Sequence, residues 1–231
     1  MMKKVIVLTG AGISAESGIN TFRAVDGLWE NHRVEDVASP IGWQKNPQLV
    51  LDFYNERRSQ INSAHPNAGH QALVDLEKAY EVIIITQNVD DLHERAGSSK
   101  VLHLHGEILR SRSTVDESLI YECPGDINLG DHCEKGSQLR PHIVWFGEMV
   151  PMMETAATLT SQADVLMIVG TSMAVYPAAS LVNFVSDSVP KYLIDPNIPA
   201  VHGVDNLTPI EAPATVGVPQ IVSELLKRAS R

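Results

Sequence analysis

Two histidines alternate along a short apolar segment and have the chemistry of proton acceptors. They are His103 and His105, in the segment 101–106, which reads V-L-H-L-H-G. Strand geometry places Val101 and both histidines on one face and the two leucines on the other. A neutral imidazole titrates near physiological pH, which suits a general base. From spacing alone, a hydrogen-bonded structural role is the commoner fate of each histidine.

An amide and a carboxylate follow a second apolar run. Asn88 and Asp90 lie two residues apart, just beyond Val82–Thr86. Together they are suited to hold a carboxamide, which needs both a donor and an acceptor. The alternative is that residues 88–91 form a plain polar turn.

A glycine-containing loop, Gly10–Gly18, follows the apolar run Val5–Thr9. Glycines let a backbone approach a pyrophosphate, and a helix starting there would stabilise its charge. The spacing departs from G-x-G-x-x-G, and no acidic residue ends a second strand about 20 residues on. The loop alone therefore predicts dinucleotide binding or a tight strand-to-helix turn.

A tyrosine and an arginine lie three residues apart, Tyr54 and Arg57, in a segment with helical spacing, Pro47–Ser63. That spacing puts both on one helix face. A guanidinium fork beside a phenol hydroxyl can receive a carboxylate. The alternative is a solvated arginine beside a half-buried tyrosine.

Apolar runs separated by helical stretches indicate the elements that position these groups. Runs that are apolar at every position are typical of strands buried on both faces of a parallel sheet. The expected strands include 5–8, 82–85, 165–169 and 192–194, and the expected helices include 47–63, 70–79, 178–185 and 219–229. This alternation predicts an α/β fold with a Rossmann-like doubly wound parallel sheet, in which ligands bind at the carboxyl ends of strands.

We expect one catalytic domain, 1–231, with a smaller second lobe formed by two insertions. The insertions are approximately 28–64, where no strand is expected, and 110–139, which is polar and holds both cysteines. The large lobe then comprises approximately 1–27, 65–109 and 140–231. A chain of 231 residues with 44% hydrophobic content can bury one substantial core without disulfides or metal.

The excess of acidic over basic residues limits the classes of partner that the protein can bind. Eighteen basic residues against 28 acidic ones give a formal net charge of −10, which argues against nucleic acid or an anionic membrane and favours lysine-bearing substrates. The apolar start is too short for a signal peptide, and no stretch approaches membrane-spanning length. Cys123 and Cys133 fit reduced thiols, so we expect a cytoplasmic location.

Five motifs in order resemble the sirtuin family. The loop 10–23 reads G-A-G-x-S-x-x-S-G-I-x-x-F-R, and the others are T-Q-N-V-D at 86–90, L-H-L-H-G at 102–106, R-P-H through W-F-G-E at 140–148 and G-T-S at 170–172. The resemblance implies a sirtuin fold and an NAD-dependent protein-lysine deacylase that releases nicotinamide and O-acyl-ADP-ribose. Only residues 110–139 and the C-terminal part of the chain match the family's motifs poorly.

The resemblance also implies roles for individual residues. His105 matches the general base, and Asn88 and Asp90 join it as catalytic residues. NAD, consumed as a cosubstrate, would be bound by Gly10, Ala11, Gly12, Ser14, Glu16, Thr21, Phe22, Arg23, Gln87, Asn88, Asp90, Gly170, Thr171, Ser172, Asn197 and Ala214. His103 keeps its structural interpretation.

For the substrate, Tyr-x-x-Arg at 54–57 resembles the class III branch of the family, which includes bacterial CobB-type enzymes. That resemblance implies that Tyr54 and Arg57 recognise the carboxylate of succinyl-lysine or malonyl-lysine, with acetyl-lysine still accepted. The acylated peptide of the protein substrate would pair as an added strand with Val144, Phe146, Gly147 and Glu148.

A structural zinc is expected to be absent. The family carries two C-x-x-C pairs between the catalytic histidine and the R-P-H segment, whereas this chain has Ser113 and Asp116 at the first pair and only Cys123 and Cys133 later. Tetrahedral zinc needs four good ligands. The alternative is a mixed set drawn from Asp116, Cys123, His132 and Cys133, which the lack of any C-x-x-C pair disfavours. We expect hydrophobic contacts to hold this lobe instead, from Val115, Leu119, Ile120, Tyr121 and Ile127.

Three other functions stay open at this point. They are a hydride-transferring Rossmann oxidoreductase, which the missing ribose acid disfavours, a noncatalytic NAD-binding sensor, and an NAD-dependent protein ADP-ribosyltransferase. The last shares its first step with a deacylase.

Overall fold

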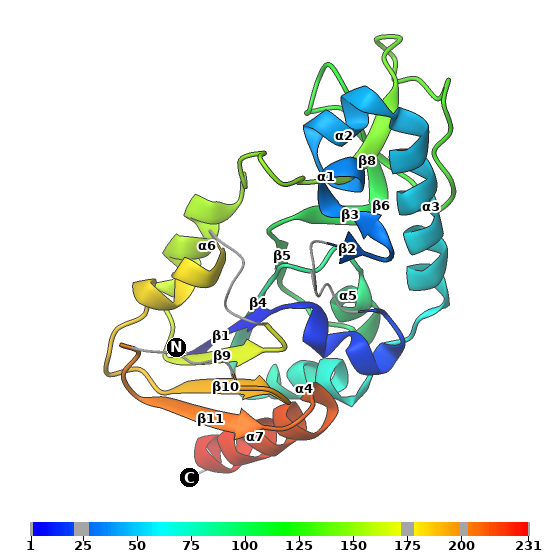
Figure 1. The fold of residues 1–231 in the computed structure, drawn as a ribbon. Helices are drawn as coiled ribbons and strands as arrows, with labels where there is room; N and C mark the ends of the chain where they lie inside the picture. The colour runs from blue at the N-terminus through cyan, green and yellow to red at the C-terminus, as the bar shows by residue number, and fades with distance from the viewer. Residues whose placement is uncertain (1, 21–27, 172–177, 199–202, 231) are drawn as a thin grey trace.

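The centre of the molecule is a parallel sheet of six strands (Figure 1). The computed structural model describes residues 2–20, 28–171, 178–198 and 203–230. The strands are β1 (Lys4–Thr9), β4 (Glu81–Thr86), β5 (Val101–His103), β9 (Val165–Val169), β10 (Lys191–Asp195) and β11 (Leu207–Glu211). Their order, β11-β10-β9-β1-β4-β5, places the chain reversal between β1 and β9, where doubly wound sheets bind ligands.

Both faces of this sheet are buried, as the continuous apolar runs predict. Along β1, Val5 and Val7 pack into one hydrophobic core, and Ile6 and Leu8 pack into another. Helices α4 (Ala68–Leu76) and α7 (Ala214–Ala229) cover the first face; α6 (Met153–Thr160) and the 3-10 helix η3 (Ala178–Phe184) cover the second (Figure 1). The predicted doubly wound α/β fold is confirmed.

Two helices differ from the sequence prediction. Helix α7 begins at Ala214, so Pro219, expected at the first position, lies inside the helix. Its missing N–H removes only the bond to the Thr215 carbonyl, a cost that the packing of this helix against the sheet offsets. The helix expected over 178–185 is a 3-10 helix that ends at Phe184.

A smaller lobe stands beside the sheet (Figure 1). It contains an antiparallel sheet in the order β7 (Ile120–Glu122), β6 (Gly106–Ser113), β8 (Leu139–Ile143), together with helices α1 (Val34–Val37), α2 (Pro40–Lys45) and α3 (Pro47–Ser63). Ser39 caps α2 by accepting from the Gly42 N–H at 3.0 Å, and Asn46 caps α3 by accepting from the Leu49 N–H at 3.2 Å. These caps and the prolines after them explain why both helices begin where they do.

The expectation of no strand between 28 and 64 is wrong. A short hairpin, β2 (Leu28–Trp29) with β3 (His32–Arg33), lies there. Glu30 and Asn31 at its turn both have positive φ, of 50° and 64°. Strands of two residues are too short to show a period-2 pattern in sequence.

A third hydrophobic core joins the two lobes. It combines Ile19 and Leu92 with Phe53 of α3, Ile108 of β6 and Trp145 after β8. Leu92 opens the remaining helix, α5 (Leu92–Ala96). The boundaries of the lobes at the residue numbers given above stay a prediction.

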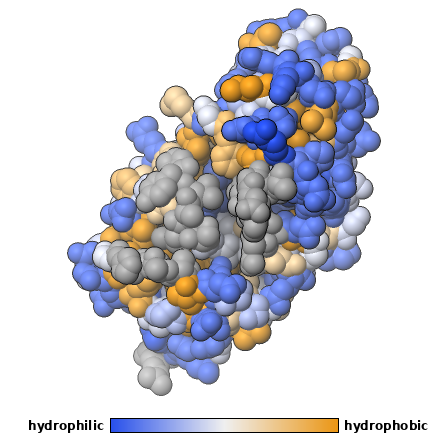
Figure 2. Space-filling view, viewed as in Figure 1, coloured by the Kyte–Doolittle hydropathy of each residue, from blue (hydrophilic) through white to orange (hydrophobic). Residues whose placement is uncertain are grey.

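The surface agrees with the acidic, polar composition. On the face drawn in Figure 2, hydrophilic residues predominate over the small lobe, and apolar residues form small groups between them. None of the helices in the described part of the chain is long and apolar enough to cross a membrane.

Candidate active site

The glycine loop lies against the end of β9 at the carboxyl edge of the sheet. Gly10 donates its N–H to the Val169 carbonyl at 3.0 Å, and Gly12 donates to the Gly170 carbonyl at 2.8 Å. A Cβ added at Gly12 would lie 2.5 Å from the Gly170 Cα atom. The close approach of two backbones therefore requires glycine and brings Gly10, Ala11 and Gly12 beside Gly170 and Thr171.

The loop continues as two 3-10 helices, η1 (Ala11–Ile13) and η2 (Ala15–Ser17), in place of the expected helix start. Between them Ser14 is fully buried. Its hydroxyl donates to Asp90 Oδ2 at 3.1 Å and accepts from Asn88 Nδ2 at 3.2 Å. Three predicted site residues from two strand ends thus form one buried polar cluster.

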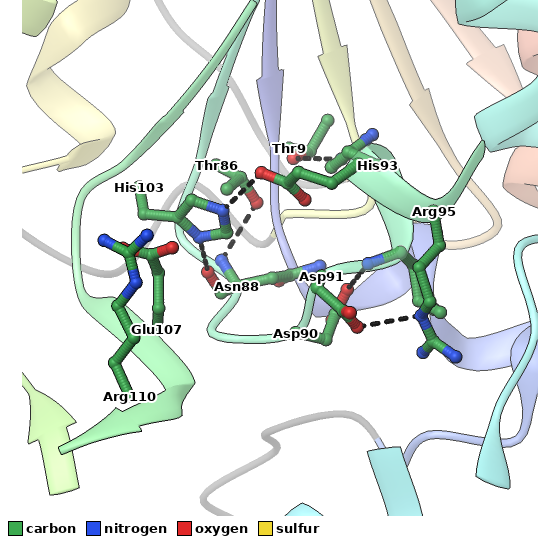
Figure 3. Close-up of polar contacts among 12 residues, drawn as sticks. Thr9, Thr86, Asn88, Asp90, Asp91, His93, Arg95, His103, Glu107 and Arg110 are labelled. Atoms are coloured by element: carbon green, nitrogen blue, oxygen red, sulfur yellow. Dashed lines mark hydrogen bonds and ion pairs between the residues drawn. The ribbon is translucent and has the colours of Figure 1, made fainter. Parts of the chain in front are cut away.

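Asp90 has little solvent contact in this cluster. Burial raises the pKa of its carboxyl, against the opposing effects of the Leu92 N–H and the Ser14 hydroxyl. One oxygen accepts from the Leu92 N–H at 3.1 Å and fixes the start of α5 (Figure 3). The carboxylate therefore shapes the loop after β4 as well as facing the site.

His105 lies between β5 and β6, since β5 ends at His103. Its Nδ1 lies 3.0 Å from the Gln87 carbonyl oxygen. A carbonyl only accepts, so Nδ1 carries the proton and Nε2 keeps a lone pair. Burial lowers the pKa of His105, while the Gln87 contact raises it in part. This neutral tautomer has the protonation state that a general base needs.

The residue after the histidine must be glycine. Gly106 has φ of +84°, and a Cβ there would collide with the His142 carbonyl of β8. The neighbouring His105 carbonyl accepts from the Val144 N–H at 2.9 Å. The histidine and the segment after β8 are therefore held together by backbone contacts.

Gln87, which follows β4, contacts residues at the ends of β1 and β9. Its N–H donates to the Thr9 carbonyl at 2.9 Å, and its side-chain amide donates to Thr171 Oγ1 at 3.2 Å. A small cavity lies at this point, lined by Leu8, Ile85, Gln87, Leu104, Thr171, Ala179 and Leu181.

Several predicted cofactor residues lie at the same edge but have protein partners. Glu16 accepts from the Thr215 N–H at 3.1 Å and from its hydroxyl at 2.7 Å, so it ties the loop to the first turn of α7. Ala214 is buried beside it at the start of that helix. Asn197 is exposed just beyond β10. Thr21, Phe22, Arg23 and Ser172 lie outside the described residues.

The Tyr54 and Arg57 pair is buried on α3. Tyr54 is 1% exposed and Arg57 is 6% exposed. The guanidinium stacks on Trp29, 4.4 Å from the ring centroid, and its Nη1 lies 3.7 Å from Glu30 Oε1. Within the described residues, Arg57 Nε and Nη1 make no hydrogen bond.

The phenol of Tyr54 is also without a hydrogen bond of good geometry, although the Trp145 indole lies near it. Burial raises the pKa of Tyr54, so the phenol keeps its proton. Burial lowers the pKa of Arg57, but the carboxylates of Glu30 and Asp90 favour the charged form.

The predicted peptide segment after β8 contains one residue with a different role. Val144 is bonded to His105, Phe146 is 49% exposed, and Gly147 has φ of +90°. Glu148, however, accepts from Arg140 Nη1 at 2.7 Å and from its neighbour, the Trp145 N–H, at 2.8 Å. Its carboxylate is thus engaged within the protein.

The arginines around Glu148 were not predicted from sequence. Arg112 of β6 lies 3.3 Å from the Glu148 carboxylate, and the Arg140 guanidinium stacks 3.2 Å from the Trp145 ring centroid. Burial lowers the pKa of Arg140, and the Glu148 bond opposes that effect. Arg140 belongs to the R-P-H motif, so its place in that motif could have marked it as a candidate site residue.

The stretch where a zinc site would lie holds other contacts. Cys133 donates its thiol to Ser113 Oγ at 3.3 Å, and Asp116 pairs with Lys135 at 2.7 Å. Among the residues that the structure describes, no group of three or more His, Cys, Asp or Glu side chains could hold a metal ion. These residues do not fit a tetrahedral zinc site.

Of the apolar residues expected to hold that lobe, Ile127 alone is buried, against Leu51 and Cys123. Val115 is 67% exposed and Ile120 is 40% exposed. The expectation that they pack into a core is wrong, because the short strand β7 lies at the edge of the small sheet.

Comparison with known proteins gives the family. Residues 10–177 match the Sir2 family. The chain belongs to the Sir2 family. It is 54% identical over 229 residues to an NAD-dependent protein deacylase of Helicobacter pylori, covering 99% of this chain and 100% of that one. It is 47% identical over 231 residues to the protein of the same name from Bacteroides thetaiotaomicron, covering 97% and 99%.

Solved Sir2 structures share the fold. A Sir2 homologue mutant in complex with ADP-ribose superposes with a TM-score of 0.90 at 38% identity, covering 99% of this chain and 94% of that one. A Sir2 homolog–NAD complex gives a TM-score of 0.88 at 38% identity, with 99% and 91% covered. A Sir2 protein bound to an acetylated peptide gives 0.79 at 28% identity, with 96% and 93% covered. The small lobe is therefore part of the Sir2 fold in this chain.

Proposed function

We propose that this Sir2 family member is an NAD-dependent protein-lysine deacylase that prefers acidic acyl groups, namely succinyl and malonyl, and also removes acetyl groups. The observation that carries the activity is the neutral His105, whose Nδ1 is held by the Gln87 carbonyl so that Nε2 can accept a proton. Its relatives are named NAD-dependent protein deacylases.

The site fits NAD by the shape of its backbone. The glycine loop follows β1 at the chain reversal between β1 and β9, where doubly wound sheets bind ligands, and its partly exposed residues Ala11 and Gly12 carry no bulky side chain that would keep a pyrophosphate away. When bound, NAD supplies a reactive ribose carbon, nicotinamide as the leaving group and ribose hydroxyls that receive the acyl group.

Each group of site residues has its own proposed role in the reaction. Asn88 and Asp90, linked through Ser14, offer an amide and a carboxylate to the nicotinamide carboxamide. His105 Nε2 accepts a proton from a ribose hydroxyl, which makes that oxygen a better nucleophile. The segment after β8, which bonds the His105 carbonyl through the Val144 N–H, lies beside the histidine where the peptide would bind, although Trp145 to Glu148 form a turn and not the expected extended stretch.

The preference for acidic acyl groups rests on Tyr54 and Arg57. Both are buried, and hydrogen-bonding atoms of each lack a partner within the described residues. Buried polar groups are costly when unpaired, so a ligand with a carboxylate would gain from meeting them. This arrangement supports the class III interpretation of Tyr-x-x-Arg.

The test is mass spectrometry of a succinyl-lysine peptide incubated with the protein and NAD. We expect loss of the succinyl mass with formation of nicotinamide and O-succinyl-ADP-ribose. Gain of ADP-ribose on protein or peptide would favour an ADP-ribosyltransferase, and no product at all would favour an NAD-binding sensor.

Three further features complete the proposal. The small lobe is stable without zinc, as the Cys133–Ser113 and Asp116–Lys135 contacts suggest. The substrates are acylated lysines of proteins and not nucleic acids or membranes, since the net charge of −10 favours cationic partners. Reduced cysteines fit action in the cytoplasm.

A further inference from the structure

His103 contacts two oxygen acceptors at once. Its Nδ1 lies 2.9 Å from the Asn88 carbonyl oxygen, and its Nε2 lies 2.9 Å from Glu94 Oε1 (Figure 3). The side chain is 9% exposed. Both distances are those of ordinary N–H···O hydrogen bonds.

A neutral imidazole has only one N–H, so it can satisfy one of these acceptors. The imidazolium satisfies both, since each ring nitrogen then donates. The ionised Glu94 carboxylate also stabilises the cation, and charge-assisted hydrogen bonds are the stronger kind. The geometry therefore favours a cationic His103.

The charged groups around His103 agree with this protonation state. Glu94 of α5 pairs with it, and Glu107 of β6 and Asp90 after β4 contribute further negative charge. On the positive side, Arg110 of β6 is paired with Glu107 at 3.1 Å, and His142 of β8 has its pKa lowered to about 4. Burial lowers the pKa of His103, but Glu94 outweighs this and the pKa is raised.

His103 and His105 bind consecutive carbonyls of the same loop. His105 bonds the Gln87 carbonyl, and His103 bonds that of Asn88. The second bond of His103 reaches Glu94 in α5, just beyond Asp90. His103 therefore fixes the loop from both ends, and that loop presents the Asn88 amide and the Asp90 carboxylate to Ser14.

We propose that His103 is a positioning residue that acts as a cationic clamp, holding Asn88 and Asp90 in place for the nicotinamide end of NAD. The proposal rests on the proposed function, because the nicotinamide contacts of this loop belong to it. The clamp differs in charge from His105, two residues further on, which must be neutral to act.

The first test reads the protonation state directly. ¹⁵N NMR of histidine-labelled protein at pH 7 should show His103 with both ring nitrogens protonated and His105 with one. In Glu94→Gln, a neutral His103 can donate to Asn88 and accept from the new amide, so one ring nitrogen should lose its proton. A neutral His103 in the unmodified protein would overturn the proposal.

The second test separates positioning from general stability. Calorimetry should show His103→Gln binding NAD about tenfold more weakly, the magnitude of a lost charged hydrogen bond, while its affinity for ADP-ribose, which lacks nicotinamide, is unchanged. Glu94→Gln should show a smaller loss for NAD alone. The exposed His65 gives a matched control, His65→Gln, with both affinities unchanged.

The outcomes distinguish this proposal from the proposed function. Equal weakening of NAD and ADP-ribose, or no change in either, would contradict the clamp even if the protein deacylates peptides. Selective loss of NAD binding in a protein that shows no deacylation would support the clamp and reject the deacylase. If His103→Gln does not fold, the NAD and ADP-ribose affinities of Glu94→Gln and the ¹⁵N NMR of the unmodified protein still test the clamp.

Discussion

The proposed reaction depends on a single lone pair, that of His105 Nε2. We expect His105→Ala to lower kcat/KM for deacylation at least about a hundredfold, because general bases contribute factors of this size. NAD affinity should change little, since the role proposed for His105 is proton transfer and His105 lies apart from the glycine loop. Steady-state kinetics and calorimetry check this, with the exposed His65→Ala as control. Near-normal turnover in a folded His105→Ala protein would eliminate the proposed base.

The same residue sets the acid side of the pH profile. Burial lowers the pKa of His105, and the base acts only when neutral, so activity is lost as the pH falls through that lowered pKa. The acid limb of kcat/KM should therefore lie below the ordinary histidine value of about 6.5. It is measured from kcat/KM against pH with saturating NAD. An acid limb above that value would contradict the assignment.

The proposed acyl preference depends on Arg57. We expect Arg57→Met to lower kcat/KM for a succinyl peptide about tenfold to a hundredfold, since a charge-assisted contact contributes roughly 1.5 to 3 kcal/mol. The acetyl peptide should be affected much less. The exposed Arg33→Met is the matched control. Equal losses on both peptides would mean that Arg57 is structural.

Sequence reasoning identified side chains better than it identified their partners. Ser14, Asn88 and Asp90 do meet, because each follows a strand whose carboxyl end lies at one sheet edge. Glu148 was expected at the peptide, but Arg112 binds it from β6, and the pairing of β6 with β8 could not be read from a polar segment. The contact between Glu94 of α5 and His103 of β5 was not predicted either, because it joins two elements that are separate in sequence.

At the scale of elements, the junction between His105 and the small sheet is the most constrained. We expect Gly106→Ala to destabilise the fold by at least about 1–3 kcal/mol, because a Cβ would meet the His142 carbonyl and φ is positive. Gly125→Ala, where a Cβ would meet nothing within 4 Å, is the control. Urea unfolding measures both. Equal stability of the two variants would show that β8 can shift to make room for the added Cβ.

The elements themselves were predictable in proportion to their burial. Strands β1, β4, β9 and β10 follow from continuous apolar runs, and helix α3 follows from helical spacing, whereas the partly exposed strand β11 did not follow. The hairpin β2–β3 and the strand β7 did not follow, because short, partly exposed strands owe their pairing to contacts with distant residues. Helix α7 begins at Ala214, five residues before its expected start at Pro219.

At the scale of the whole molecule, the small lobe should need no metal. We expect no stoichiometric zinc in protein purified without chelator, and no change in Tm when chelator is added. The donor set explains this, because Asp116 is paired with Lys135 and a serine stands beside Cys133. Elemental analysis and thermal unfolding give the answer. About one zinc per chain, with unfolding on its removal, would show the expectation to be wrong.

The contact between the glycine loop and Gly170 has a consequence for how this sequence can change over evolutionary time. A side chain that collides with another side chain can be accommodated when a second mutation shrinks its neighbour. Here a Cβ at Gly12 would meet the backbone of residue 170, and a Cβ at Gly170 would meet the backbone of residue 12. No substitution shortens a peptide backbone, so neither position has a compensating partner, and each change is unfavourable in every genetic background that keeps this loop.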